Sequence, residues 1–348
     1  MAILKCKMCG GILDYDPVRD LALCPYCGSK STIYDRDRKL FEQFRNQFAA
    51  LMNQEPATQP EEGFFVESSR EELIREDGEI IEIDYLTKRR ADMCTMYVAR
   101  RNVIYVFEKA YAVYAERYRD MIGRLAYPSL EMERELSCYV PKLVTECRLS
   151  DGSRFLAIEK KEGVYPLKML GTFIDRHVAW VISRLENLCC LLQYNEMVLN
   201  AFTLDNLFVD PSNHQIYLYG GWWFCGFRGA QIIGACESVK PYLEKAKGLH
   251  RLGGSRNRTR TDLESIRLIA IKLLGFADRE ALREHAYADG EKILPEPFLK
   301  FLMQEPEPDA MADFSKWDRV LLESYGERKF IPLAMAEEEV YSRSGENH

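Results

Sequence analysis

The feature that most constrains the fold of this chain is a long apolar segment followed by two short β-prone runs. Residues 177–192 carry large apolar side chains on nearly every side of a helix, which predicts a buried helix. A polar loop containing Asn206 follows, and after it come the apolar runs 207–209 and 216–219. The Asp-Pro-Ser-Asn sequence at 210–213 predicts a hairpin turn between the two runs. We therefore expect a buried helix, a polar loop and a hairpin, in that order.

This order resembles the catalytic loop and metal-binding loop of the protein-kinase fold. In that family the loop reads H-R-D-x-x-x-x-N, and the hairpin after it ends in D-F-G. Counting back five residues from Asn206 gives Ala201 instead of the Asp, and Gly220 stands in the stretch that would supply the second Asp. The resemblance implies that Asn206 is retained as a nucleotide-binding residue. It also implies that Ala201 and Gly220 replace the two catalytic Asp residues of the family. It therefore implies a pseudokinase.

The strands expected between Glu79 and Lys109 resemble the first half of a kinase small lobe. The glycine-rich phosphate loop of the family would fall at 85–90, a stretch that contains no glycine. By this resemblance Lys109 is the candidate phosphate-binding lysine. A register shift would place Glu108 there instead, and a solvated strand end explains Lys109 equally well.

The lysine of the family pairs with a glutamate on a helix. The resemblance offers Glu131, Glu133 and Glu135 for this role, with Glu133 as our chosen candidate. A solvated acidic helix face accounts for all three equally well.

Two further segments extend the resemblance. Ser-Asp-Gly-Ser at 150–153 predicts a hairpin leading to the hinge expected at 159–163. Residues 261–275 predict a helix capped by Thr261 and stopped by Gly275. Asp262 matches the residue that ties the family's central helix to the catalytic-loop backbone, which is a structural role. The basic segment 240–260 between them is expected to be a solvated loop.

The first 34 residues carry a separate signal. Cys6 and Cys9 form one Cys-x-x-Cys pair and Cys24 and Cys27 form another, with fourteen residues between the pairs. Two such pairs supply the four thiolates that zinc binds tetrahedrally. The segment resembles a zinc ribbon, and a shell closed by four cysteines leaves no position for a catalytic water. We expect structural zinc.

Composition limits the remaining possibilities. The 348 residues carry a net charge of −7, which argues against nucleic acid as the main partner of the whole chain. No apolar run is long enough to span a bilayer, and the first residues do not resemble a signal peptide. We expect a cytoplasmic protein whose remaining seven cysteines are reduced.

Together these signals predict an α+β chain in which a small zinc ribbon precedes a two-lobed protein kinase-like domain. The expected parts are the ribbon (1–34), a helix and linker (35–74), the small lobe (75–162), the large lobe (163–336) and a disordered tail (337–348). Three functions remain open. The first is a pseudokinase that docks protein partners and binds ATP weakly or not at all. The others are an atypical active serine/threonine kinase, with carboxylates supplied by Asp205 or Asp210, and a zinc-ribbon nucleic-acid-associated protein.

Overall fold

The computed structural model describes residues 68–237, 239–240, 258–288, 294–326 and 337–342, the single residues Ile331, Leu333 and Met335, and three short strands near the N-terminus. These strands, β1 (Asp14–Asp16), β2 (Leu21–Leu23) and β3 (Lys30–Thr32), form an antiparallel sheet in sequence order. The cysteines at positions 6, 9, 24 and 27 lie outside the described residues, as do residues 35–67. The predicted zinc site and linker helix therefore stay predictions.

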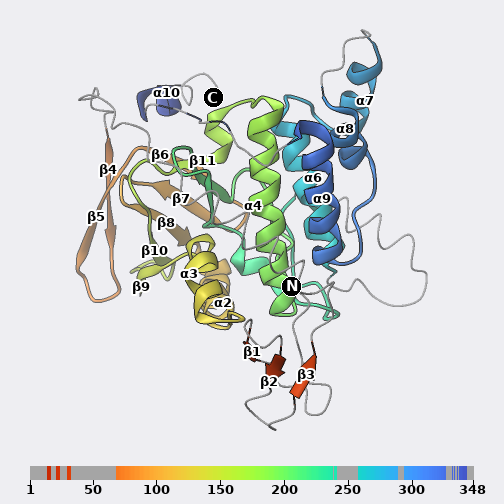
Figure 1. Ribbon diagram of the computed structural model, residues 1–348. Helices are drawn as coiled ribbons and strands as arrows, with labels where there is room; N and C mark the ends of the chain where they lie inside the picture. Colours follow the sequence, from red (N-terminus) through yellow and green to blue (C-terminus); the bar gives the residue numbers. More distant parts are fainter. Residues whose placement is uncertain are drawn as a thin grey trace.

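The small lobe is built on a five-stranded antiparallel sheet (Figure 1). Its strands, in the order β6-β7-β8-β10-β9, are β6 (Thr87–Arg90), β7 (Cys94–Val98), β8 (Asn102–Phe107), β10 (Arg154–Glu159) and β9 (Leu143–Arg148). Between β8 and β9 the chain forms the short 3₁₀ helices η1 (Lys109–Tyr111) and η2 (Ser137–Tyr139) and the helices α2 (Ala112–Gly123) and α3 (Leu130–Leu136). Helix α2 packs against β8 and β10.

The outer face of this sheet is covered by an additional hairpin. Strands β4 (Ser69–Ile74) and β5 (Ile80–Tyr85) pair with each other, and Ile83 packs into a cluster with Tyr97, Ile104 and Phe155 of the sheet. The stretch that we predicted to be the end of a linker is therefore strand β4. The alternation of side chains along β8 explains the two layers, because Val103, Tyr105 and Phe107 face inward while Ile104 faces the hairpin.

The large lobe is mostly helical. Its helices are α4 (Asp175–Tyr194), α6 (Thr259–Leu273), α7 (Arg279–Ala288), α8 (Glu296–Met303) and α9 (Ala310–Tyr325). Its short strands and 3₁₀ helices are β11 (Tyr165–Pro166), η3 (Leu167–Leu170), β12 (Met197–Val198), β13 (Leu207–Asp210), β14 (Gln215–Leu218), η4 (Trp222–Phe224) and β15 (Gly226–Phe227). The predicted buried helix is confirmed, since α4 packs against both α6 and α9. The predicted hairpin is also confirmed, since β13 and β14 pair on either side of the 210–213 turn.

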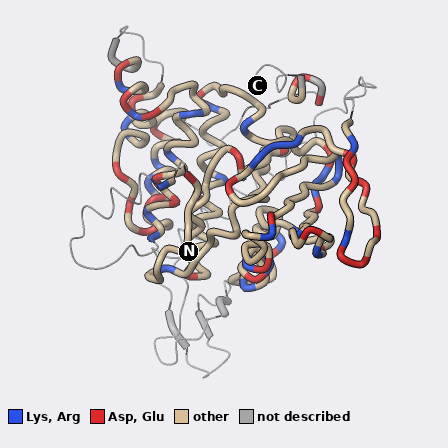
Figure 2. Tube along the Cα trace, turned by 180° about the vertical axis from the view of Figure 1, so that it is seen from behind, with Lys and Arg blue, Asp and Glu red and all other residues tan. Residues whose placement is uncertain are grey.

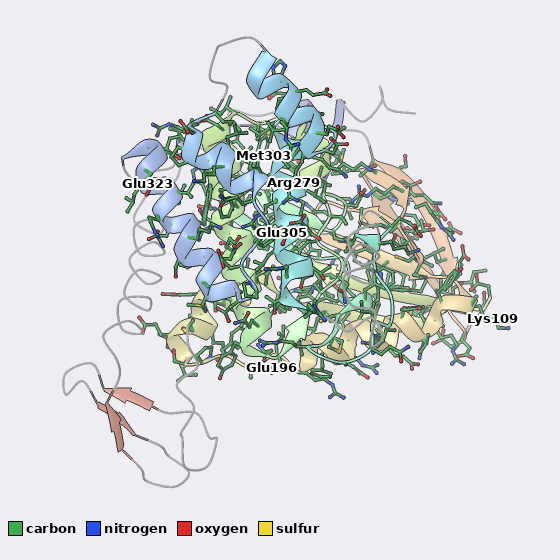
Figure 3. All side chains as sticks on the ribbon, turned by 90° about the vertical axis from the view of Figure 1, so that its right-hand side faces the viewer. Lys109, Glu196, Arg279, Met303, Glu305 and Glu323 are labelled. Atoms are coloured by element: carbon green, nitrogen blue, oxygen red, sulfur yellow. The ribbon has the colours of Figure 1, made fainter. Side chains whose placement is uncertain are left out.

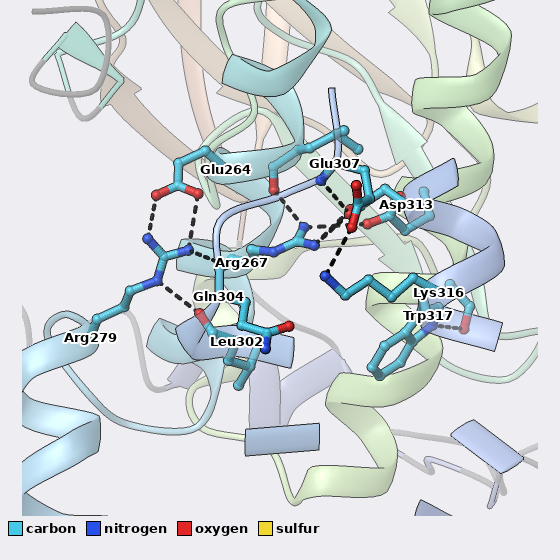
Figure 4. Close-up of polar contacts among 12 residues, drawn as sticks. Glu264, Arg267, Arg279, Leu302, Gln304, Glu307, Asp313, Lys316 and Trp317 are labelled. Carbon is cyan, nitrogen blue, oxygen red and sulfur yellow. Dashed lines mark hydrogen bonds and ion pairs between the residues drawn. The ribbon is translucent and has the colours of Figure 1, made fainter. Parts of the chain in front are cut away.

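A fully buried ionic group joins three of these helices (Figure 4). Arg267 of α6 binds Asp313 of α9 at 2.8 and 2.7 Å, and its guanidinium lies 3.6 Å from Glu186 of α4. Burial and the neighbouring Asp313 raise the pKa of Glu186 well above its ordinary value. Burial thus favours the neutral form of Glu186 next to the Arg267–Asp313 ion pair. This arrangement fixes the relative positions of α4 and α6, which hold the polar loop between them.

Two predicted helix features differ from the structure. Helix α6 begins at Thr259 rather than after Thr261, and its N-cap residue Arg258 makes no side-chain capping bond. The C-terminal tail that we predicted to be disordered contains helix α10 (Glu337–Ser342), in which Val340 and Tyr341 are buried. These apolar side chains explain why this part of the tail folds onto the protein. No helix among the described residues is long and apolar enough to cross a membrane.

Candidate functional site

The candidate site is the loop between β12 and β13, at the junction of the two lobes. Asp262 of α6 accepts hydrogen bonds from the backbone N–H groups of Asn200 (2.9 Å) and Leu199 (2.7 Å). Asn200 has a positive φ of 59°, so the chain turns sharply at this point. The carboxylate thus holds the loop in the conformation that brings Ala201 and Asn206 together.

Asn206 is committed to contacts within the protein. Its side-chain Nδ2 donates to the carbonyl of Ala201 at 2.9 Å and lies 3.4 Å from Sγ of Cys236. Its own carbonyl accepts from the backbone N–H groups of Tyr219 and Gly220, both at 3.2 Å. The side chain is buried, so it closes the end of the hairpin.

Gly220 and Gly221 leave no room for side chains. A Cβ atom added to Gly220 would lie closer than 3.0 Å to Oδ1 of Asn206, and one added to Gly221 would lie 2.6 Å from Cβ of Ala201. Gly221 also has a φ of +84°, which side chains rarely adopt. No carboxylate can stand at position 220 without displacing Asn206.

Aromatic side chains fill the interior beside the two glycines. Trp223 contacts Tyr105 and Phe107 of β8 with ring centroids 5.3 and 5.4 Å apart, and it stacks on Tyr118 of α2 at 6.0 Å. Tyr118 donates its hydroxyl to the carbonyl of Tyr219 at 2.6 Å. All of these rings are fully buried, so the space between β8, α2 and the hairpin is packed rather than open.

Lys109 and Glu133 do not face this site, which corrects both expectations. Strand β8 ends at Phe107, and Lys109 begins η1 on the surface, at the margin of the molecule (Figure 3). Glu133 lies on α3 and is exposed, as is Glu131, whereas the helix that packs on β8 is α2. The strand itself lies where it was predicted, but it ends before Lys109, and the helix that packs on it is α2 rather than the α3 that carries Glu133.

The prediction also placed the counterpart of the phosphate loop at the wrong residues. The turn between the two strands at this edge is formed by residues 91–93, and residues 87–90 form β6 itself. The β4–β5 hairpin shifted the prediction, because it adds two strands before the sheet begins. Asp92 in this turn accepts a hydrogen bond from the thiol of Cys236 at 3.0 Å, and Arg89 binds the carboxylate of Asp205 at 2.6 Å.

The carboxylates closest in sequence to Asn206 are engaged elsewhere. Asp205 pairs with Arg89 and with Lys168, whose Nζ lies 3.0 Å away. Asp210 accepts from the backbone N–H and hydroxyl of Ser212 and from the side-chain amide of Asn213, so it caps the hairpin turn. Asp210 lies four positions along the strand from Asn206, which is roughly 13 Å.

Two backbone N–H groups at the start of the hinge segment are already bonded within the protein. The N–H of Glu159 donates to Lys142 at 2.9 Å, and the N–H of Lys160 donates to Arg101 at 2.8 Å. Nζ of Lys160 donates to the carbonyls of Val164 and Lys161. Burial lowers the pKa of this amine to about 8.

Sequence reasoning missed Tyr105, Tyr118 and Cys236 as residues of this site. The alternation of β8 was a usable signal, because it places Tyr105 on the same face as Val103 and Phe107. Cys236 lies in an irregular segment, and its position depends on contacts that sequence spacing does not reveal. Among the described residues, no three His, Cys, Asp or Glu side chains gather as metal ligands do.

No model of a protein family matches this chain, and no curated protein matches its sequence. Among solved structures, that of vaccinia related kinase 3 is similar to it, with 17% sequence identity and a TM-score of 0.47. The match covers 81% of this chain and 96% of that chain. Similarity at this level says nothing about activity. Activity is therefore judged from the geometry of the candidate site.

Proposed function

We propose that this chain is a catalytically inactive kinase-like protein, a pseudokinase, that acts as a protein-docking or regulatory module. The order of its elements supports the kinase-like assignment. A helix lies between the third and fourth strands of the main sheet, and an Asp at the start of a central helix holds the loop before the hairpin. The inactivity is carried by one observation, which is the absence of space for a side chain at Gly220.

Phosphoryl transfer needs groups that this cleft does not present. Magnesium requires near-octahedral oxygen ligation and is usually held by carboxylates together with substrate phosphates. Gly220 offers no ligand, and Asn206 is bonded to Ala201. The atypical active kinase is disfavoured because Asp205 and Asp210 are occupied by neighbouring residues.

The distribution of charge supports a docking role with a protein partner. Figure 2 shows basic and acidic residues interspersed over the described surface rather than one continuous basic face. Together with the net charge of −7, this pattern favours a protein partner over nucleic acid. The four cysteines of the N-terminal segment are a suitable set of ligands for structural zinc, which would give the chain a second folded surface.

The test is thermal unfolding with and without Mg-ATP, because a ligand that binds the folded state raises stability by RT ln(1 + [L]/Kd). At a ligand concentration equal to Kd the gain is only about 0.4 kcal/mol, so millimolar nucleotide is needed. We expect no magnesium-dependent shift, because the cleft holds neither metal ligands nor a phosphate loop. Phosphate transfer from labelled ATP is measured in parallel, on the protein itself and on generic substrates.

Asn206→Ala serves as the control for both measurements. A magnesium-dependent shift that disappears in this variant would restore the active kinase as the better assignment. Phosphate transfer that depends on Asn206 or Asp210 would do the same.

A further inference from the structure

The β6–β7 hairpin reaches from the small lobe to the loop of the large lobe through two separate contacts. Arg89 binds both the carboxylate and the carbonyl of Asp205, the residue that precedes Asn206. Asp92, at the turn of the same hairpin, accepts from the thiol of Cys236. One short element thus contacts two segments that are about thirty residues apart in the sequence.

The second contact lies over the interior of the cleft. Cys236 is only 3% exposed, and its thiol lies between Asp92 above and the side-chain amide of Asn206 below. Its backbone N–H donates to the carbonyl of Asn200 at 3.2 Å. The hairpin therefore covers one side of the thiol.

We propose that the tip of the β6–β7 hairpin, residues 89–93, is a latch that opens and closes over Cys236 while β7 stays packed in the core through Cys94 and Met96. The latch consists of the pairs Arg89–Asp205 and Asp92–Cys236. This inference rests on the proposed function, because it assumes that no nucleotide is bound at the candidate site.

The composition of the latch explains why it opens locally. Side chains of Arg89 and Asp205 are 21% and 47% exposed, and Asp92 is exposed as well. Contacts of this kind contribute less than buried ones, because solvent screens them. By contrast, Trp223 and Tyr118 behind the latch are fully buried. Segments with few buried apolar contacts open at a lower free energy than the core does.

The test is labelling of the native protein with a thiol-reactive maleimide, followed by mass spectrometry of each cysteine peptide. Cys189 and Cys225, which are fully buried in the core, report global unfolding. In the wild-type protein we expect Cys236 to react faster than these two. Its rate should also depend weakly on low concentrations of urea, since local opening exposes little surface.

Arg89→Ala should speed the labelling of Cys236 by about two- to fivefold, because it removes a partly exposed ion pair with Asp205. The matched control is Arg90→Ala, which removes an exposed pair with Glu108 one residue away on the same strand. It should leave the rate unchanged.

Equal rates in Arg89→Ala and Arg90→Ala would overturn the latch. So would an equally steep urea dependence of Cys236, Cys189 and Cys225 in the wild-type protein, a result that requires no variant to fold. The labelling is done without nucleotide, so a failure of the latch can be distinguished from a failure of the pseudokinase assignment.

Discussion

At the scale of residues, the small side chains of Ala201 and Gly220 determine how the candidate site is packed. Ala201 and Gly220 carry no carboxylate, and their small size also leaves the space that Asn206 fills. Asn206 occupies the space beside Gly220 and donates to the carbonyl of Ala201, so the packing depends on the small size of both residues. Restoring a carboxylate at position 220 would therefore not restore a metal site.

Gly220→Ala tests this packing. The added methyl group would collide with Asn206, and overpacking of a buried site costs about 1–3 kcal/mol. The measurement is the free energy of unfolding in urea. The control is Gly123→Ala at the end of α2, where nothing lies within 4 Å of the added atom, and it should be neutral or slightly stabilising. Equal effects of the two substitutions would show that the space beside Gly220 is larger than the structure indicates.

Asp262→Ala should destabilise the protein by about 2–4 kcal/mol, because two buried N–H groups of the loop would lose their acceptor. Urea unfolding measures the loss. Asp262→Asn should cost less, since the amide oxygen still accepts one of the two bonds. A wild-type stability in Asp262→Ala would mean that the loop keeps its shape without the carboxylate.

The same residue predicts a pH dependence. Burial raises the pKa of Asp262 from 3.8 to about 7, although the two N–H donors oppose the shift. Because the folded pKa lies above the unfolded one, the folded state binds more protons between these values. The stability contributed by this group is full below the unfolded pKa and is lost as pH rises through the folded pKa. Unfolding of the wild-type protein and of Asp262→Asn, compared from about pH 4 to pH 8, should show this loss only in the wild type.

At the scale of elements, helix α10 extends the contact between the lobes on the hinge side. Glu337 pairs with Arg100 between β7 and β8, and the ring of Tyr341 meets Tyr165 of β11 edge to face at 6.1 Å. Glu337 also lies close enough to Lys160 to raise its pKa against the larger lowering effect of burial. The helix therefore lies near Lys160, which is only 4% exposed, whereas Lys161 and Glu162 of the hinge segment are exposed.

Tyr341→Ala should loosen α10 and expose Lys160. Since burial lowers the pKa of Lys160 to about 8, much of this amine is neutral at that pH, and access limits its acylation. Mass spectrometry after brief treatment with an amine-acylating reagent should show several-fold more modification of Lys160 in the variant. Lys161 is exposed in the native protein and serves as the internal control, with equal modification in both. Unchanged protection of Lys160 would mean that the hinge is covered without α10.

At the scale of the whole molecule, the two lobes are joined at several places. Besides the latch and α10, Tyr118 donates to Tyr219, Arg117 donates to the carbonyl of Cys225, and the side-chain amide of Asn195 exchanges hydrogen bonds with the backbone of Ala126. An aromatic core continues from β8 into the hairpin of the large lobe. Both lobes should therefore unfold together, whereas the zinc that we propose for the N-terminal segment would give it a separate source of stability.

Removal of zinc tests this division. Each chain should contain about one equivalent of zinc by elemental analysis, because the four cysteines complete one tetrahedral shell. A strong chelator should unfold the N-terminal segment and leave the main urea transition unchanged. The double variant Cys6→Ser/Cys24→Ser should behave like the chelated protein. Unchanged zinc content in that variant would refute the ligand assignment, and a shift of the main transition would show that the parts are coupled.

Much of the architecture could be predicted because it depends on local patterns. The all-round apolar surface of 177–192 required a buried helix, the Asp-Pro-Ser-Asn sequence required a turn, and the Asp-Gly pair at 151–152 required another. The positions of Ala201, Asn206 and Gly220 could likewise be counted along the chain. These features depend on residues a few positions apart, so the sequence by itself determined them.

What the tertiary structure decided is which distant residues meet. Lys109 and Glu133 were chosen by spacing, but an extra hairpin and a second helix shifted the elements, and Tyr105 and Tyr118 took the inner positions. The segment of Cys236 has no periodicity that would place it under Asp92. Such contacts form between segments whose separation along the chain carries no geometric information, so only packing could select them. The sequence places Ala201 and Gly220 where the resemblance expects carboxylates, whereas only the tertiary structure shows that Asn206 lies against Gly220.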